Sequence, residues 1–258
     1  MADSRPHILS VRSVAKRFGG IRAVDDCTIN IEAQSIVGLI GPNGAGKTTL
    51  FNLISGFYKP DNGEILFKGD RMDNLSSYLI ARKGLVRTFQ ITRALSKMTV
   101  LENMMLSPKN QSGEKIWNVW LRGRKVREEE GRNRDKAEEL LRLFSLYRLR
   151  DEYSGALSGG QKKLLELARA LMLDPEMILL DEPFAGVNPT LSLQILEYIT
   201  EIRNRGVTFL IIEHDMPMIT KASEIMCAMS EGKIIALGSP EEVRRHEAVI
   251  EAYLGKEK

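Results

Sequence analysis

The chain has 258 residues, of which 43% are hydrophobic and 28% are charged. A chain of this length buries about three quarters of its unfolded surface, so one or two domains with a substantial core are expected. The composition is typical of a globular protein and excludes a largely disordered one. Because the net charge is only +3 and the charges are dispersed, nucleic acid is not expected as a partner.

Membrane spans and export are also not expected. No apolar run approaches the roughly 18 residues of a spanning helix. The segment Met1–Val14 lacks the hydrophobic region of a signal peptide. Cys27 and Cys227 each lie in an apolar segment without metal-ligand spacing, and we interpret them as buried, reduced thiols. The expected compartment is the cytoplasm, so if a membrane is involved, another chain crosses it.

The first ninety residues alternate strand-like stretches with turn signals. The expected strands are Ile8–Val14, Cys27–Ala33, Ser35–Ile40 and Glu64–Lys68, and the expected helix is Lys47–Ser55.

Between the third strand and this helix lies the pattern GxxxxGK[ST], spelled Gly41-Pro42-Asn43-Gly44-Ala45-Gly46-Lys47-Thr48. Glycines let backbone N–H groups turn toward an anion, and the helix start adds its positive dipole end. Lys47 is predicted to reach the β and γ phosphates, and the Thr48 hydroxyl to ligate Mg²⁺. Thr49 is expected to support the phosphate from the next position. The pattern predicts a loop that binds phosphates.

From about Ile91 to Leu157 the character changes to helix-forming residues, with a 3.6-residue period in Ala137, Leu140, Leu141 and Phe144. We interpret this stretch as a helical insertion. Within it, one short amphipathic face is supplied by Ile116, Trp117, Trp120 and Leu121. That face covers the insertion's own core or forms an edge toward a membrane or a partner.

Beyond Gly160, helices and strands alternate again, which predicts a parallel sheet with helices on both faces. The expected elements are the helix Gln161–Leu173, the strand Met177–Asp181, the helix Thr190–Asn204, the strand Val207–Ile212, a hairpin of Ile225–Met229 and Lys233–Leu237, and the helix Pro240–Leu254.

Polar residues follow two of these strands, where α/β sheets bind ligands. Asp181 is predicted to contact Mg²⁺ directly or through another ligand of the ion, and Glu182 to orient or deprotonate water. His214 follows the next strand by two residues and is expected to contact the γ phosphate or the attacking water. His7 and His246 are given structural roles only.

The segment Leu157-Ser158-Gly159-Gly160-Gln161 begins a helix and is the most specific motif in the chain. Its hydroxyl, glycine N–H groups and helix start form a second potential anion site. This motif resembles the signature of ATP-binding cassette (ABC) proteins, and the resemblance extends over almost the whole chain. It implies that the signature of one subunit faces the phosphate loop of another, with two ATP molecules between them.

The resemblance also assigns other positions. Phe18, 23 residues before Gly41, matches the aromatic residue that stacks on adenine. Gln90, at the end of Arg87-Thr88-Phe89-Gln90, matches the glutamine that senses Mg²⁺ and the attacking water. At the end of the loop after the acidic pair, Asn188 replaces the family's aspartate, which leaves its coupling role open, and Asn188-Pro189 is also a good helix start.

The implied fold is α/β: a phosphate-loop NTPase core with a parallel sheet, an N-terminal antiparallel β subdomain and an inserted α-helical subdomain. Residues 1–258 would form one nucleotide-binding domain, with 1–90 and 161–258 as the core and 91–160 as the helical subdomain. The implied activity is ATP hydrolysis coupled to transport, with catalytic residues Lys47, Gln90, Glu182 and His214.

Several stretches look like the ATP-binding subunit of branched-chain amino acid uptake systems, among them Arg17–Gly20, Phe51–Tyr58 and Ile250–Gly255. That likeness implies a second ATPase subunit, two membrane permease subunits, an extracytoplasmic binding protein, and a peripheral location on the cytoplasmic face of the inner membrane. The alternatives are a lipid or lipopolysaccharide exporter, a urea or amide importer, and a soluble non-transport ATPase of the same family.

Overall fold

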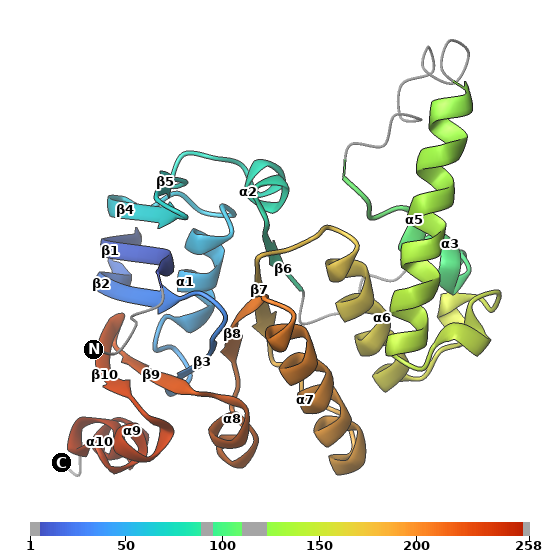
Figure 1. Cartoon of the computed structure of the whole chain (residues 1–258). Helices are drawn as coiled ribbons and strands as arrows, with labels where there is room; N and C mark the ends of the chain where they lie inside the picture. Colours follow the sequence, from blue (N-terminus) through green and yellow to red (C-terminus); the bar gives the residue numbers. More distant parts are fainter. Residues whose placement is uncertain (1–5, 89–94, 110–122, 255–258) are drawn as a thin grey trace. The chain divides into compact units, whose positions relative to one another are not determined.

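The computed structural model describes residues 6–88, 95–109 and 123–254, and the chain divides into two compact units (Figure 1). The first unit contains the described residues up to Arg87 and those from Glu176 onward, and the second runs from Thr88 to Pro175. The boundaries predicted after residues 90 and 160 differ from these. The second unit extends to Pro175 because the helix that follows the signature packs on other helices of this unit.

A six-stranded sheet forms the centre of the first unit, in the order β10-β9-β3-β8-β7-β6. Its strands are β3 (Ile36–Ile40), β6 (Leu85–Arg87), β7 (Met177–Asp181), β8 (Thr208–Ile212), β9 (Ile225–Ser230) and β10 (Lys233–Gly238). Neighbouring strands from β9 through β6 are parallel, and β10 is antiparallel to β9. The predicted parallel sheet and terminal hairpin are both confirmed.

Alternate residues of each strand point to opposite faces of this sheet. Both faces are covered by helices. Val37 and Leu39 belong to the main core, together with residues of α1 (Lys47–Ile54). Gly38 lies between them and faces α8 (Met216–Ala222), where an added Cβ would lie 2.8 Å from Ile219 Cγ1. The helix α7 (Pro189–Asn204) packs beside α8 (Figure 1).

A second, antiparallel sheet in the same unit has the order β2-β1-β4-β5. Its strands are β1 (His7–Phe18), β2 (Ile21–Glu32), β4 (Asn62–Phe67) and β5 (Asp70–Arg71). β1 and β2 form a longer hairpin than predicted, with Phe18 opposite Ile21. The shorter prediction follows from register shifts near Ser13 and Asp26, which have positive φ angles and interrupt the apolar alternation.

The predicted C-terminal helix Pro240–Leu254 is two helices, α9 (Pro240–Arg245) and α10 (Glu247–Leu254). His246 between them has ψ 126°, an extended conformation that ends α9. No proline or glycine marks this break, so the sequence pattern reads through it. The short helix α2 (Ser77–Lys83) precedes β6.

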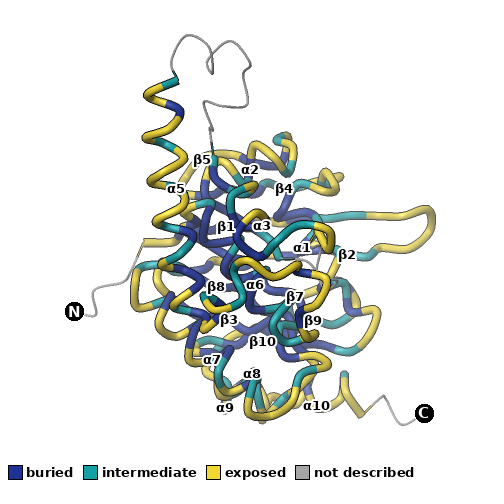
Figure 2. The backbone as a smooth tube through the Cα atoms, turned by 90° about the vertical axis from the view of Figure 1, so that its right-hand side faces the viewer, coloured by how far each residue is buried: buried dark blue, intermediate teal, exposed yellow. Residues whose placement is uncertain are grey.

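The second unit is helical, as predicted for the insertion. It contains α3 (Val100–Met105), α5 (Gly123–Leu143), two 3₁₀ turns (Tyr147–Leu149 and Ser154–Ala156) and α6 (Gly159–Leu171). The predicted apolar face of Ala137, Leu140, Leu141 and Phe144 is buried, whereas most of α5 is exposed (Figure 2). Trp117 and Trp120 lie outside the described residues.

Cys27 and Cys227 are buried free thiols, as expected. Burial raises the pKa of Cys27 to about 12 and also raises the pKa of Cys227. Within the described ranges, no helix is long and apolar enough to span a bilayer.

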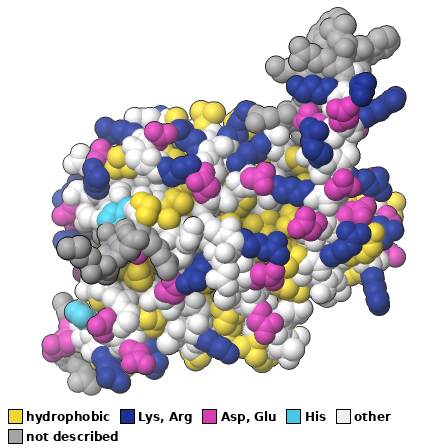
Figure 3. All heavy atoms as spheres, viewed as in Figure 1, with side chains coloured by type: hydrophobic (Ala, Val, Ile, Leu, Met, Phe, Trp, Pro, Cys, Tyr) yellow, Lys and Arg dark blue, Asp and Glu magenta, His cyan; other side chains and the backbone are white. Residues whose placement is uncertain are grey.

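The surface carries both signs of charge, with Lys and Arg side chains interspersed among Asp and Glu on the face shown in Figure 3. Several of these charges form exposed ion pairs, such as Lys68 with Glu176 and Lys83 with Asp70.

Candidate active site

The segment Gly41–Gly46 connects β3 to α1 and wraps back toward the start of that helix. Gly41 and Gly46 have φ angles of 152° and 103° and lie against backbone from other elements. A Cβ at Gly41 would lie 2.1 Å from the Met229 carbonyl oxygen, and one at Gly46 would lie 2.2 Å from that of Ala23. Glycine is therefore required at both positions for steric as well as conformational reasons.

Gly44 differs, because a Cβ there would meet no atom within 4 Å, although its φ of 81° also favours glycine. Asn43, Gly44 and Thr48 are exposed, so this side of the loop is open to a ligand. The loop and the first turn of an eight-residue helix thus present backbone N–H groups at a helix N-terminus, the arrangement that binds phosphate.

Lys47 is buried, and its ammonium donates to two carbonyl oxygens of the loop itself, those of Gly41 at 2.6 Å and Pro42 at 3.0 Å. Burial lowers the pKa of Lys47, while the charges of Glu182 and Asp181 partly oppose that effect. The lysine and both acids therefore share one site, where the cation is poised for an anionic ligand.

The ends of β7 and β8 place a carboxylate against an imidazole. His214 Nε2 lies 2.8 Å from Glu182 Oε1, and the Glu182 N–H donates to the Ile212 carbonyl oxygen at 2.9 Å. Glu182 has φ 51°, a left-handed conformation that is strained for a residue with a side chain. Such outliers cluster at functional sites. Here the residue in the left-handed conformation is the one whose carboxylate contacts the imidazole.

Asp181, at the end of β7, is buried and paired with a cation that the sequence analysis did not assign. Arg87 Nη2 lies 2.8 Å from Asp181 Oδ2, and Arg87 Nη1 donates to Asn52 Oδ1 of α1 at 2.6 Å. A positive charge thus lies beside the Asp181 carboxylate. The Asp181 carboxylate and the Thr48 hydroxyl are oxygen ligands of the kind that Mg²⁺ prefers, so these residues fit that ion. The other predicted metal-site residue, Gln90, lies outside the described residues.

Phe18 ends β1 and is partly exposed. Its ring meets that of Tyr58 edge to face, with centroids 5.2 Å apart, and the Lys16 ammonium lies 5.8 Å from its centroid. An exposed aromatic with a neighbouring cation suits stacking against a nucleobase.

The signature segment lies in the other unit and caps α6. The Ser158 hydroxyl accepts the Gln161 N–H, and the Gln161 side chain accepts the Ser158 N–H, a capping box. Gly159 has no atom within 4 Å of an added Cβ, so its surroundings are open. Asn188 caps α7 in the same manner, with Oδ1 accepting the Leu191 N–H at 2.8 Å. The predicted helix-start role of Asn188 is confirmed.

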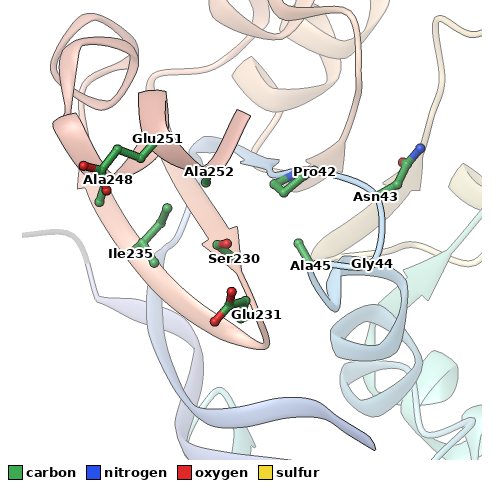
Figure 4. Close-up of a pocket in the computed structure, with 10 residues that line it drawn as sticks. All are labelled: Pro42, Asn43, Gly44, Ala45, Ser230, Glu231, Ile235, Ala248, Glu251 and Ala252. Atoms are coloured by element: carbon green, nitrogen blue, oxygen red, sulfur yellow. The ribbon is translucent and has the colours of Figure 1, made fainter. Parts of the chain in front are cut away.

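A pocket of about 490 Å³ lies beside the phosphate loop (Figure 4). Pro42, Asn43, Gly44 and Ala45 form one side; Ser230, Glu231 and Ile235 of the terminal hairpin and Ala248, Glu251 and Ala252 of α10 form the other. Because two carboxylates line this pocket, it does not suit phosphate groups. The next residue of α10 after Ala252 is Tyr253, whose hydroxyl accepts the Gly41 N–H at 2.8 Å.

Three residues at this site were given no role from the sequence: Arg87, Glu213 and Tyr253. Arg87 lies in the motif that ends at Gln90, Glu213 directly precedes His214, and Tyr253 lies in the C-terminal stretch. Position next to an assigned residue is the only signal that the sequence offers for them, because their contacts join elements far apart in the chain.

Comparisons with known proteins show what the chain is similar to. Residues 24–185 match the family model described as ABC transporter, and residues 233–258 match that described as branched-chain amino acid ATP-binding cassette transporter. The chain is 43% identical to the probable branched-chain amino acid transport ATP-binding protein LivG of Archaeoglobus fulgidus, over 96% of this chain and 95% of that protein. It is 39% identical to the high-affinity LivG of Escherichia coli K12, over 96% and 98% of the two chains.

Among solved structures, a nucleotide-free ATP-binding cassette from an ABC transporter aligns with a TM-score of 0.84 and 36% identity, over 97% of this chain and 100% of that one. The ADP conformation of an ATP-binding cassette aligns with a TM-score of 0.81 and 35% identity, over the same shares of the two chains.

Proposed function

The chain belongs to the ATP-binding cassette family of transporter subunits, and from this premise we propose that it powers the import of branched-chain amino acids by binding and hydrolysing ATP. The observation that carries the catalytic half of the proposal is the 2.8 Å contact between Glu182 and His214 at the carboxyl edge of the sheet, beside Lys47. The substrate class rests on the names of the similar proteins and on the match at residues 233–258.

ATP binding follows from the loop. The N–H groups of Gly44–Thr48 surround the β and γ phosphates, and Lys47 moves from the carbonyls of Gly41 and Pro42 to the phosphate oxygens. Phe18, with Tyr58 against its edge, stacks on the adenine.

Hydrolysis requires a positioned water and stabilised charge rather than a covalent intermediate. Glu182 accepts a hydrogen bond from the water and polarises it, and His214 holds the Glu182 carboxylate while it faces the γ phosphate. Gln90 is proposed to contact the same water. Thr48, Asp181 and Gln90 would hold Mg²⁺, which would supply positive charge to stabilise the phosphate oxygens. Arg87 pairs with Asp181 when the metal does not.

Each chain contributes half of two sites. Ser158 and the N–H groups of Gly159 and Gly160 approach the γ phosphate bound to the partner subunit, so ATP closes the pair and hydrolysis reopens it. The pair moves two permease subunits at the cytoplasmic face of the membrane, and these receive the amino acid from an extracytoplasmic binding protein. Asn188 keeps a hydrogen-bonding side chain at the end of the loop after the acidic pair, without the usual charge.

The variant Glu182→Gln tests the catalytic half. ATP affinity should be retained, turnover should fall about 100-fold or more because the general base is lost, and ATP should trap a dimer visible by size-exclusion chromatography. Glu241→Gln, an exposed change on α9, is the control and should turn over normally as a nucleotide-dependent dimer. A monomeric Glu182→Gln protein with normal turnover would contradict the assignment.

The transport half is tested by uptake. The chain, reconstituted in proteoliposomes with two permease subunits and the binding protein of a branched-chain amino acid transporter, should drive ATP-dependent accumulation of labelled leucine. The same vesicles with Glu182→Gln should not. Uptake of urea or short amides but not leucine, or neighbouring genes for envelope-bridging proteins, would replace the proposed substrate.

A further inference from the structure

Glu213 is a buried carboxylate that joins the two loops carrying the catalytic pair. It directly follows β8, and the residue is 2% exposed. Its Oε1 accepts the Phe184 N–H at 2.7 Å, while its Oε2 accepts the His214 N–H at 3.0 Å and lies 3.5 Å from the Asp215 N. One side chain thus holds the backbone two residues after Glu182 and the backbone of His214 itself.

The catalytic pair, Glu182 and His214, lies on the two loops that Glu213 joins and needs such support. Glu182 is in a left-handed conformation, and a non-glycine residue persists there only when its surroundings hold it. On the β8 side, the segment around Glu182 is held by the hydrogen bond from the Glu182 N–H to the Ile212 carbonyl oxygen, by the contact with His214, and by the hydrogen bond from the Phe184 N–H to Glu213. These contacts join the residues after β7 to the last residue of β8 and to the loop that follows it.

We call the hydrogen bonds that the Glu213 carboxylate accepts from the Phe184 and His214 N–H groups the Glu213 clamp. This clamp requires two acceptor oxygens. Two backbone N–H groups from different loops each need one oxygen, and an ionised carboxylate supplies both. Burial raises the pKa of Glu213, and the N–H groups of Phe184, His214 and Asp215 oppose that shift. A glutamine of the same shape has one acceptor, so its NH₂ group would face the N–H of one of the two loops.

We propose that Glu213 is a positioning residue for ATP hydrolysis, which fixes the Glu182 carboxylate and the His214 imidazole in register by tying the backbone of both loops to one buried carboxylate. The inference rests on the proposed function. It assigns Glu213 no contact with nucleotide, and its effect on the reaction passes through the other two side chains. The hydrogen bonds of Glu213 go to Phe184, His214 and Asp215 and not to the described phosphate loop, so we expect nucleotide binding not to depend on the clamp.

The test is Glu213→Gln in the full chain, with ATP turnover, nucleotide affinity and thermal unfolding measured together. The turnover number should fall about 10- to 100-fold, since displacement of a catalytic group by about 1 Å costs up to that factor. The dissociation constant for ATP should stay within about twofold of the unmodified chain. The control is Asp215→Asn, a carboxylate-to-amide change two residues away, which keeps the α8 cap because asparagine caps as well as aspartate.

A background without the imidazole separates positioning from general stability. In His214→Ala, adding Glu213→Gln should lower the residual turnover by less than about twofold, because the imidazole with which Glu213 holds Glu182 in register is already absent. An equal loss in both backgrounds would show that Glu213 only stabilises the fold and would overturn the proposal. If Glu213→Gln does not fold, Glu213→Asp, which keeps both oxygens but is one methylene shorter, is measured in the same two backgrounds with the same criterion.

Failure of the proposed function has a different outcome. If the unmodified chain hydrolyses no ATP under any of these conditions, the catalytic assignment itself is wrong. If the unmodified chain and Asp215→Asn turn over ATP and Glu213→Gln does so equally well, only the role of Glu213 is wrong.

Discussion

Arg87 forms the most buried ion pair at the site, and its neighbours explain why it can lie there. Its side chain is 10% exposed and that of Asp181 7%, and its guanidinium lies 5.6 Å from the Phe51 ring centroid. Asn52 accepts a further hydrogen bond. Two charges removed from water stabilise the fold only while both are present, because the loss of one leaves the other unpaired in a low-dielectric interior.

Substitution of Arg87 by methionine should therefore lower the free energy of unfolding by about 3–5 kcal/mol, as is usual when one partner of a buried pair is removed. Urea titration without nucleotide measures this directly. The matched control is Lys68→Met, which breaks the exposed pair with Glu176, whose side chains are 49% and 47% exposed, and should cost less than about 1 kcal/mol. Equal losses in the two variants would show that burial adds nothing to the Arg87 pair.

Residues with a fixed spacing to a glycine motif or a strand end could be found from the sequence, and Lys47, Glu182 and His214 are of this kind. Their neighbours along the chain define their place on the sheet edge. Arg87 and Glu213 could not be given a role in that way, because their partners lie 94 and 29 residues away. A charged residue beside an apolar run gives no sign of being buried until its partner is known.

Among the elements, strands with buried faces on both sides were predicted best. All residues of β3, β7 and β8 are buried, and such strands appear as uninterrupted apolar runs. β6 has three residues and β5 has two, which is too short for any periodicity to be read. The division of the C-terminal helix at His246 was also missed, since neither glycine nor proline marks the extended backbone of His246 at which α9 ends.

The division into α9 and α10 matters because it brings α10 to the phosphate loop. Tyr253 accepts the Gly41 N–H at 2.8 Å, and burial raises the pKa of its hydroxyl, with this hydrogen bond acting in the opposite direction. Gly41 is the first residue of the loop and has a positive φ against the Met229 carbonyl. The tyrosine hydroxyl thus helps to hold the base of the loop in the shape that binds phosphate.

The variant Tyr253→Phe should raise the dissociation constant for ATP about 2- to 10-fold, because a net contribution of 0.5–1.5 kcal/mol per hydrogen bond corresponds to that range. Titration with a fluorescent ATP analogue measures the change. Tyr78→Phe removes a hydroxyl that pairs with Arg82 on the surface and should leave the affinity unchanged. An unaltered affinity for Tyr253→Phe would show that the contact between α10 and the loop has no role in nucleotide binding.

At the scale of the whole molecule, the two helix starts that we propose to bind phosphate belong to different compact units. The phosphate loop and α1 are in the first, and Ser158 with α6 is in the second. Each unit has its own buried core, so a change on the exposed surface of one does not remove the binding groups of the other. This separation makes the pairing model testable, because binding by one chain and hydrolysis by two chains depend on different units.

Ser158→Arg should leave the ATP affinity of the isolated chain within about twofold of the unmodified value and lower hydrolysis about 100-fold, since it removes the hydroxyl and blocks the second phosphate site with a bulky side chain. Nucleotide titration and phosphate release measure the two effects.

Loss of the helix cap alone costs about 1 kcal/mol, and Ser239→Arg, at another exposed capping box, reproduces that loss without touching the signature. Ser239→Arg should therefore hydrolyse ATP normally. If Ser158→Arg instead weakens ATP binding by the single chain as much as it slows hydrolysis, the signature serves its own subunit's nucleotide and the head-to-tail pair is excluded.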